Sequence, residues 1–588
     1  MELSHRIVDA IWRPSFVLKY HELQAYLHPS SGRTGPAPWD QSPLNPRNLV
    51  DSLNNTSSRW RIDGATICGT CIYVIPLDLL PTLPPLGIFL FLLDQTDYPP
   101  ALRHSLDASV SVPLRDGRAI SGQGIAKHLC RALDHYCAQN PDFLDQYLRL
   151  PFGSKLILEE LASDPASMKL EVERVYDIES KMLTVTALQQ LWSDVARDAW
   201  PPILDVHDLR LIRQINEAVS LVETPGIKLC IQPLSIFKSA AGSLDHMYHE
   251  LHLLLTCPQH PHIMSRPLAI VTKKASFGGK DGVVGFLLQY FQAGSIRDIL
   301  PNRQRSGTLL NSVKLRWCRQ IASALAHLNA TGIFYSDLRP DNVLLDSNRP
   351  DAGVVLCDFE QRGNWYEWCA PEVLYRQYAE NIRSRLPARV INPPYDRLLK
   401  GYHYSHSLSD SKCYTSAETH IESSNRAWFA LPAAAREKAT VYNLGLFIYT
   451  VFEGLSNVEC NIANQFPNEQ EVEFPVFRRT PDVIRELIQR CVADTPDRQV
   501  EELESGPFRV VRRNGLLYPR TRTDLERNTY ETVTAVMDSA FRYWAIELAC
   551  AEKFLESPMW PSGNFGHNRP SLRDVSDILE RLPEDFEE

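Results

Sequence analysis

Hydrophobic and polar residues follow different patterns on the two sides of residue 201. Between about 100 and 200, apolar residues recur at the spacing of a helix, which places them on one face. The clearest case is the stretch 168–200, whose apolar positions lie three to five residues apart: Leu170, Val175, Ile178, Met182 and Val185. This pattern predicts one long helix that ends at Pro201–Pro202, because the residue before a proline disfavours helical geometry.

The sequence before this stretch has a weaker pattern. Residues 30–60 are rich in Ser, Pro, Asn and Gly, which is typical of a surface loop or a disordered stretch. The most apolar run, 65–94, is divided by Asp78 and several prolines, so it predicts short core strands or helices. We interpret residues 1–205 as an N-terminal region of unknown type that is mostly helical after about 100.

After about 206, short strand-like runs are followed by long helices, which predicts the α+β class. "LSIFKSA" is strand-like and "LDHMYHELHLLL" is helical in pattern. Residues 311–332 carry one apolar helical stripe and end at Gly332, a residue favoured just past a helix. Two short strands, "NVLLD" and "VVLCDF", then flank the turn "SNRPDAG". A polar stretch at about 376–438 precedes "TVYNLGLFIYTVFEG", which is apolar on most faces and therefore predicts a buried helix.

Composition and charge exclude several classes of partner. The chain has 588 residues, and 61 Lys and Arg against 71 Asp and Glu give a net charge of -10, which does not suggest a nucleic-acid partner. No apolar run approaches the ~20 residues that a membrane-spanning helix needs, so we expect no membrane partner. The N-terminus has no signal-peptide pattern, and the 13 irregularly spaced cysteines do not form a secreted disulfide framework. We therefore expect a cytoplasmic or nuclear protein with reduced thiols, including those of the pair Cys68 and Cys71.

The chemistry is concentrated in the loop after the 311–332 helix. Asp337, Arg339 and Asn342 lie within six residues, and the following strand pair returns Asp358 close to them. Phosphoryl transfer needs these types of group. An acid accepts the proton of the nucleophile, an amide and a second acid hold metal ions, and a cation steadies the transferring phosphoryl group.

With these residues in this order, the sequence resembles the eukaryotic protein kinase superfamily, in particular the divergent kinase-like proteins of filamentous fungi. "SDLRPDNVLL" resembles the catalytic loop of the family, "CDFE" its metal-binding DFG motif, and "CAPEV" its APE motif. The resemblance covers about 206–588. It implies a two-lobed fold with a small, mainly β N-lobe at 206–292. A larger helical C-lobe at 293–588 would carry the insertion at about 376–438 and a C-terminal extension.

The resemblance also implies a site for ATP and Mg²⁺. Lys238 would pair with the α- and β-phosphates while Glu250 aims its ammonium group. The adenine would lie against the hinge between the lobes, at residues Gln289, Tyr290 and Phe291. The implied catalytic residues are Asp337, Arg339 and Asn342, and the implied metal ligands are Asn342 and Asp358.

Several family features are missing. Glycines should cover the phosphates, but "SLVETPGIKLCIQ" offers only Gly226, and "SFGGKDG" follows the Glu250 helix and predicts a hairpin turn. Weak nucleotide binding is the expected consequence. The His-Arg pair before the catalytic acid is replaced by Tyr335–Ser336.

The segment that the family phosphorylates for activation is also reduced. It contains only "QRGNWYEWC", where Tyr366 is the one residue that could be phosphorylated. Without a phosphate there, no arginine is needed to bind it. Glu360 replaces the glycine of DFG and either attracts a cation or repels the nucleotide. Thr440 replaces an aspartate that braces the catalytic loop, and either Arg498 or Arg569 would pair with Glu372.

Three functions remain open from the sequence. The first is ATP-dependent phosphotransfer to Ser or Thr of a protein. The second is an inactive or weakly active pseudokinase that acts as a binding or regulatory scaffold, which the missing family features favour. The third is a kinase-like enzyme that acts on a small molecule, which the short activation segment favours. The histidines at 246–262 lack the HExxH spacing of a zinc site, and no GxSxG motif indicates a hydrolase.

Overall fold

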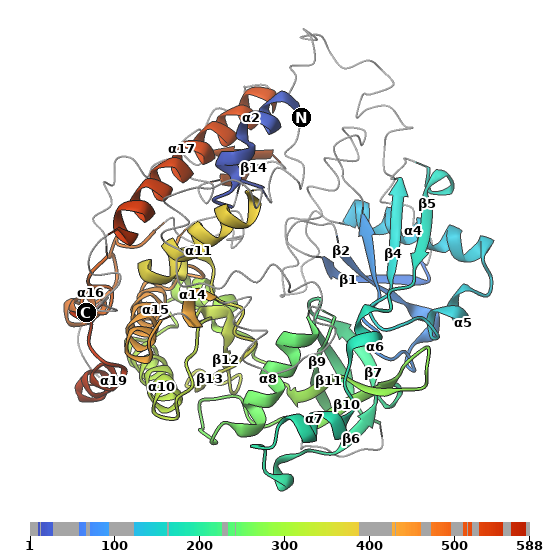
Figure 1. The fold of residues 1–588 in the computed structure, drawn as a ribbon, viewed down its shortest axis with the longest axis horizontal. Helices are drawn as coiled ribbons and strands as arrows, with labels where there is room; N and C mark the ends of the chain where they lie inside the picture. The colour runs from blue at the N-terminus through green and yellow to red at the C-terminus, as the bar shows by residue number, and fades with distance from the viewer. Residues whose placement is uncertain are drawn as a thin grey trace.

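The structure is a computed structural model, and Figure 1 shows how its elements are arranged. A five-stranded sheet and a six-stranded sheet lie next to each other, and a helical lobe follows. The residues that the structure describes are 10–11, 13–26, 58–65, 71–92, 123–160, 164–225, 233–241, 243–386, 426–429, 431–459, 472–495, 510–513, 516–519, 529–556 and 566–583.

The five-stranded sheet is built from the N-terminal part of the chain, in the spatial order β1-β2-β3-β4-β5. β3 and β4 are parallel and the other pairs are antiparallel. The helices α4 and α5 lie in the same part of the chain, and α4 buries Leu129 and Leu133. The elements are β1 Trp60–Ala65, β2 Cys71–Pro76, β3 Phe89–Leu92, α4 Gln123–Gln139, α5 Phe143–Tyr147, β4 Lys155–Glu160 and β5 Lys169–Glu173. The apolar run thus forms core strands, as predicted, and the thiol of Cys71 is buried in β2; Cys68 lies outside the described residues.

The prediction of one helix over 168–200 is wrong. The chain forms β5 and then only short helices, α6 Asp177–Lys181 and α7 Val185–Leu191. The sequence of β5, "KLEVE", alternates polar and apolar residues, and its pairing with β4 decides in favour of a strand. The N-terminal region is therefore helical in α4 and α5 but mixed overall. The boundary near 205 remains a prediction.

The six-stranded sheet has the order β6-β10-β11-β9-β8-β7, with α8 beside it. All neighbours are antiparallel except β6, which runs parallel to β10. The turn "SFGGKDG" joins β10 to β11 as predicted, with Gly278 and Gly279 at positive φ. The elements are β6 Ile203–Asp205, β7 Arg210–Gln214, β8 Val219–Glu223, β9 Leu234–Ser239, α8 Leu244–Thr256, β10 Ala269–Lys274 and β11 Asp281–Gln289.

The helical lobe is organised around α10 and α15. The predicted stripe of α10 is buried at Trp317, Ile321, Leu325 and Leu328, and α15 is buried along most of its length, as predicted. The helix α11 continues past 376, where we predicted an insertion, and most of that insertion lies outside the described residues. The elements are α9 Ile296–Arg305, α10 Asn311–Ala330, β12 Val343–Leu345, β13 Val354–Leu356, α11 Pro371–Arg385, α14 Arg426–Phe429, α15 Ala433–Glu453, α16 Asp482–Cys491 and α19 Leu572–Arg581.

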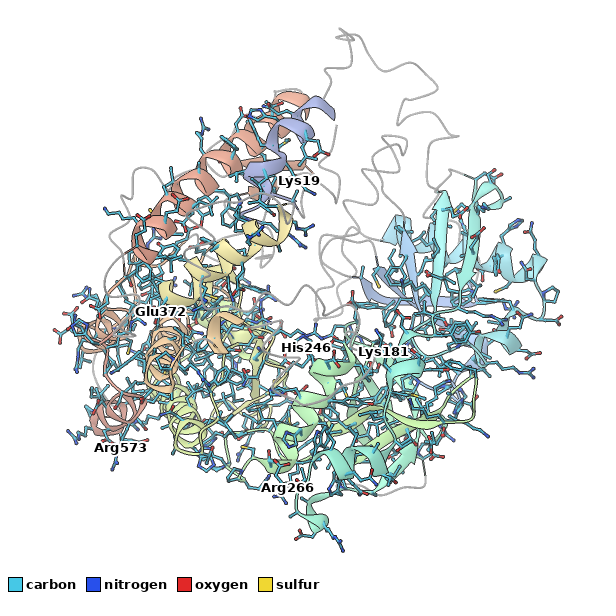
Figure 2. All side chains as sticks on the ribbon, in the orientation of Figure 1. Lys19, Lys181, His246, Arg266, Glu372 and Arg573 are labelled. Atoms are coloured by element: carbon cyan, nitrogen blue, oxygen red, sulfur yellow. The ribbon has the colours of Figure 1, made fainter. Side chains whose placement is uncertain are left out.

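Arg569 closes this lobe by pairing with Glu372 at the start of α11. Arg569 Nη1 lies 2.6 Å from Glu372 Oε1, and both side chains are 1% exposed. Arg569 Nε also donates to the carbonyl of Ala493 at 2.8 Å. The other candidate partner, Arg498, lies outside the described residues. Figure 2 labels Glu372 inside the helical lobe.

Two helices that are distant in the sequence pack together. The helix α2 Phe16–Tyr26 lies against the long helix α17 Thr529–Leu555 (Figure 1). The rings of Tyr20 and Phe541 stack with centroids 4.3 Å apart, and Trp544 Nε1 donates to the carbonyl of Ile11 at 2.8 Å. A small hairpin, β14 Val510–Arg513 with β15 Leu516–Pro519, precedes α17. No helix in the described part of the chain combines the length and apolar character needed to cross a bilayer.

Candidate functional site

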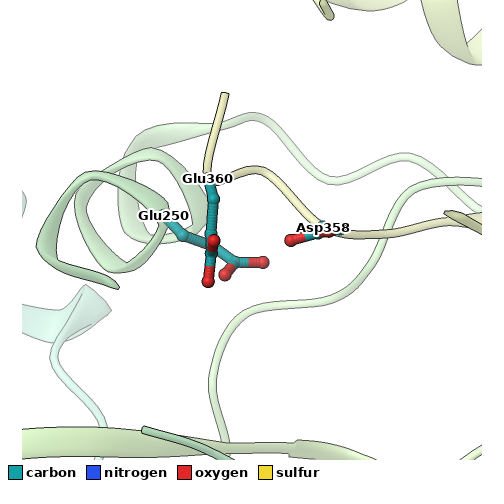
Figure 3. Close-up of side chains that lie close together, drawn as sticks. All are labelled: Glu250, Asp358 and Glu360. Atoms are coloured by element: carbon teal, nitrogen blue, oxygen red, sulfur yellow. The ribbon is translucent and has the colours of Figure 1, made fainter. Parts of the chain in front are cut away.

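Lys238 lies at the centre of three carboxylates. It is on β9, and its Nζ lies 2.9 Å from Asp358 Oδ1, 2.9 Å from Glu360 Oε1 and 3.3 Å from Glu250 Oε2. Figure 3 shows the three carboxyl groups turned toward one another. Burial opposes the charged form of Lys238, but the carboxylates of Asp358, Glu250 and Glu360 together raise its pKa well above the usual value. The predicted Lys238–Glu250 pair is therefore formed.

The helix α8 holds Glu250 in this position. Its side chain is 1% exposed, and Oε1 accepts a hydrogen bond from the backbone N–H of Phe359 at 3.0 Å. The outer side of α8 is braced by the segment after α6. There the hydroxyl of Tyr248 accepts from Leu183 N at 2.7 Å and donates to Val283 O at 3.0 Å. The packing of α8 thus fixes Glu250 through contacts outside the activation segment.

The catalytic loop brings Asp337, Arg339 and Asn342 together. Asn342 Nδ2 donates to the carbonyl of Asp337 at 2.8 Å and to its Oδ2 at 3.0 Å. Arg339 Nη2 lies 3.4 Å from Asp337 Oδ2, and its guanidinium group lies 4.3 Å from the ring centroid of Trp365. Burial raises the pKa of Asp337 to about 7, against the lowering effect of Arg339. Asp337 Oδ1 is buried and has no hydrogen-bond partner among the described residues.

The residues around Asp358 adopt an uncommon backbone geometry. Asp358 has φ 63°, which few residues other than glycine adopt without support. Burial favours its neutral form, but Lys238 holds the pKa of Asp358 below its usual value. The ring of Phe359 is buried against Tyr335, with centroids 5.2 Å apart, and the Tyr335 hydroxyl donates to the carbonyl of Cys357. Tyr335 therefore supports the Asp358 turn, a role that we did not predict for it.

Gln361 joins the segment after Asp358 to the catalytic loop. Its Oε1 accepts from the backbone N–H of Ser336 at 2.9 Å and from the Ser336 hydroxyl at 2.8 Å. Its amide nitrogen donates to the carbonyl of Phe334. Sequence reasoning missed Gln361, because a glutamine 25 residues after Ser336 gives no local signal. A neutral amide thus makes the connection for which the family uses an arginine and a phosphate.

Thr440 does not brace the catalytic loop. Its hydroxyl donates to the carbonyl of Arg436 within the same helix, at 2.9 Å. The guanidinium group of Arg436 instead lies 5.0 Å from the ring centroid of Phe334, whose ring stacks on Trp428. The base of the loop is therefore held by aromatic and cation–π packing rather than by a carboxylate.

The short activation segment is packed into the helical lobe. Trp368 Nε1 donates to Asn457 Oδ1 at 2.6 Å, and Asn364 Nδ2 donates to the carbonyl of Leu338 at 3.0 Å. The ring of Tyr366 packs edge-on against those of Tyr378 and Trp544. Burial raises the pKa of Tyr366 to about 12. The ring that carries the phosphorylatable hydroxyl is therefore held by packing against the helical lobe.

The turn that would cover the phosphates was assigned to the wrong place in the sequence. The first hairpin of the lobe is β7–β8, so its turn is residues 215–218, "INEA", which contains no glycine. Gly226 belongs to the next connection and lies outside the described residues. The turn bends back onto the sheet, where Ala218 O accepts from Ser239 N at 2.7 Å. β7 is also tied to the five-stranded sheet, because Gln214 N donates to Asp63 Oδ2 at 2.7 Å.

The end of β11 and the hinge residues after it contact different sides of the sheet. Phe286 pairs with Lys238 and Leu288 with Ile236, so alternation places Phe286 and Leu288 on the same face as Lys238. Gln289 lies on the other face, where it and Phe291 line a cavity of about 480 Å³ with His260. Leu288 was not among the predicted residues. The contact of Gln289, Tyr290 and Phe291 with adenine remains a prediction.

The donor set fits a magnesium–nucleotide complex in part. Asp358 supplies carboxylate oxygen and Asn342 supplies amide oxygen, the ligand types that Mg²⁺ prefers. Glu250, Asp358 and Glu360 form a cluster in which one oxygen of each lies within 4.8 Å of the others. Lys238 occupies the centre of this cluster, so its carboxylates are already partly neutralised by an ammonium group.

Comparison with known proteins agrees with this geometry. The protein kinase domain family matches residues 230–382. The serine/threonine-protein kinase Sgk1-B of Xenopus laevis is 30% identical over 145 residues, which cover 22% of this chain and 30% of that protein. Sgk1 of Rattus norvegicus matches to the same extent, with 30% identity over 145 residues, 22% of this chain and 30% of the relative. The chain thus spans less than a third of the length of these curated relatives.

The match at 230–382 contains Lys238, Glu250, the catalytic loop and Asp358, which the structure brings together around one site. The strand order β7-β8-β9-β11-β10, the position of α8 and the helical lobe agree with the two-lobed fold that the sequence predicted. In sequence and in fold, residues 230–382 are therefore similar to the eukaryotic protein kinase superfamily.

Proposed function

We propose that this chain is a divergent kinase that transfers the γ-phosphoryl group of ATP to Ser or Thr of a protein. The observation that carries the proposal is the contact of Lys238 with both Glu250 and Asp358, at 3.3 Å and 2.9 Å. An assembled Lys–Glu pair next to a metal-binding aspartate is what phosphoryl transfer in this family requires. The choice of Ser or Thr rests on the similarity to serine/threonine-protein kinases.

The catalytic loop supports a role in proton transfer. Asp337 Oδ1 is buried and without a partner among the described residues, so it is available to a substrate hydroxyl. As the hydroxyl oxygen bonds to the γ-phosphorus and the bond to ADP breaks, Asp337 accepts the hydroxyl proton. Asn342 and Asp358 would hold Mg²⁺, which neutralises phosphate charge when it is bound. Arg339 would place a positive charge beside the transferring group.

ATP with Mg²⁺ should bind this protein weakly, with a Kd of about 0.1–1 mM, since the turn at 215–218 offers no glycine backbone to the phosphates. At ten times the Kd, a ligand that binds only the folded state adds about 1.4 kcal/mol of stability. Thermal unfolding measured across ATP–Mg²⁺ concentrations should therefore show a small rise in Tm that does not saturate at micromolar nucleotide. No shift at any concentration would contradict the proposed function.

Replacement of Tyr366 by Phe should leave the activity within about twofold of the parent, because the ring packing is kept and no phosphate is needed to connect the segment to the catalytic loop. The ring of Tyr366 packs against those of Trp544 and Tyr378, and Gln361 connects the segment to the catalytic loop without a phosphate. The measurement is the initial rate of phosphate transfer to a general protein substrate. A hundredfold loss with an unchanged Tm would show that phosphorylation at this position is needed.

A second function, that of a pseudokinase scaffold, is favoured by one observation. Glu360 occupies a contact position on Lys238 at 2.9 Å, where a phosphate oxygen would have to bind. A scaffold would keep binding its partner when the carboxylates of Asp337 and Asp358 are removed.

The third function, transfer to a small molecule, is favoured by the short segment 361–369, which offers little surface for an extended peptide.

A further inference from the structure

The carboxylate of Glu360 lies between two cations, Lys238 and Arg362. Its Oε1 lies 2.9 Å from Lys238 Nζ, and its Oε2 pairs with Nε of Arg362. Its backbone carbonyl lies 3.1 Å from Nδ1 of His246, at the start of α8. The side chain of Glu360 is 7% exposed. It is therefore part of the site and not a solvated residue of the loop.

Three carboxylates already surround the ammonium group of Lys238, where a phosphate would have to bind. A lysine offers three N–H donors, and three carboxylates, those of Glu250, Asp358 and Glu360, lie within 3.3 Å of Nζ. A phosphate oxygen can bind Lys238 only if one carboxylate leaves or shares its contact. Charge acts in the same direction, because the carboxylate of Glu360 adds a negative charge beside the polyphosphate and partly cancels the ammonium group that would attract it.

The three carboxylates differ in how easily they can leave. Glu250 is almost completely buried, and its other oxygen accepts from the backbone of Phe359. Asp358 is held at a positive φ by its buried neighbours and would hold the metal. Glu360 already has a second partner in Arg362, whose side chain is 44% exposed, so its carboxylate can turn outward with that arginine and keep one ion pair.

We propose that Glu360 is a built-in competitor for Lys238, which takes the place of a nucleotide phosphate and thereby sets the affinity for nucleotide polyphosphates. This proposal rests on the proposed function of the same site. Sequence reasoning left open whether Glu360 attracts a cation or repels the nucleotide, and its contact with Lys238 favours repulsion. The affinity determined by Glu360 should depend on the phosphates of the ligand and not on its adenine.

The experiment compares the parent chain with Glu360→Gln, which keeps the size of the side chain and removes its charge. Calorimetric titrations measure the Kd for ATP–Mg²⁺, ADP–Mg²⁺ and adenosine. Close charge pairs couple by about 1.5 kcal/mol or more, so ATP–Mg²⁺ should bind the variant about tenfold or more tightly. ADP–Mg²⁺ should gain less, and adenosine should change by less than about twofold since it carries no phosphate. The control is Asp281→Asn, which removes an exposed carboxylate of the same lobe at the start of β11 and should leave all three affinities unchanged.

The outcomes separate this inference from the proposed function. An unchanged affinity for ATP–Mg²⁺ in Glu360→Gln, with the parent also binding, would overturn the inference and leave the nucleotide site intact. Weaker binding in the variant would overturn it as well, because Glu360 would then act as a metal ligand. An equal gain for adenosine would show that the substitution opens the whole pocket, which also contradicts the inference. If folded parent and variant bind none of the three ligands, both proposals fail.

Discussion

Asp337→Asn lowers turnover by about a hundredfold or more, the usual effect of losing a positioned acid–base group, while ATP binding stays nearly intact. The asparagine keeps the size of the side chain and its bond to Asn342, but it cannot accept the proton of the substrate hydroxyl. A base acts on the barrier more than on ground-state binding. The effect should therefore fall on kcat in a phosphotransfer assay and leave the Kd measured by titration with ATP–Mg²⁺ almost unchanged.

The matched control for this experiment is Asp351→Asn. Asp351 lies in the turn between β12 and β13, close in the sequence to the catalytic loop, and its side chain is 64% exposed. Its substitution removes the same charge without touching the site, so turnover should not change. If Asp337→Asn also has normal turnover, Asp337 is not the base. If neither the parent nor the variant transfers phosphate but both bind ATP, the scaffold function replaces the enzymatic one.

Arg569→Met should destabilise the protein by about 3–5 kcal/mol, the cost of removing one partner from a buried ion pair. Glu372 would be left charged at 1% exposure, and the carbonyl of Ala493 would lose its donor. The measurement is chemical unfolding followed by circular dichroism. The contact joins residues 197 positions apart, so we expect the helical lobe to be most affected.

Two further variants show whether the ion pair is the cause. Arg573→Met changes an exposed arginine on the next helix, labelled in Figure 2, and should alter stability by less than about 0.5 kcal/mol. The double variant Arg569→Met with Glu372→Met removes both charges and should recover part of the loss, because no unpaired charge remains buried. A double variant as unstable as the sum of the two single variants would indicate lost packing instead of an unpaired charge.

The positions of the residues proposed for catalysis were predictable because their sequence signals are local. Asp337, Arg339 and Asn342 lie within six residues, and the helix before them and the strand pair after them have clear periods. The run "LSIFKSA" and the helix pattern around Glu250 placed the Lys238–Glu250 pair in the same way. In each case the residues that form the helix or strand are neighbours in the chain. The spacing of their apolar side chains is therefore sufficient to identify that helix or strand.

Other features had no local signal. The segment at 168–173 satisfies a helical spacing, but it also alternates, and only the presence of β4 beside it decides for a strand. The first hairpin was misplaced because "RLIRQINEAVSLVE" carries no glycine to mark its turn. The roles of Gln361 and Tyr335 depend on hydrogen bonds to groups more than 20 residues away in the sequence, at Ser336 and Cys357.

By itself, the sequence determined the α+β class, the two long buried helices, the strand pair after the catalytic loop and the residues that surround the site. The tertiary structure decided which partners these residues have. It brought Arg569 to Glu372. It also placed Glu360 beside Lys238, although the two residues are 122 positions apart in the sequence. Local elements follow from short-range periodicity, whereas a buried ion pair depends on how distant elements pack, since its strength comes from distance and burial that no local pattern contains.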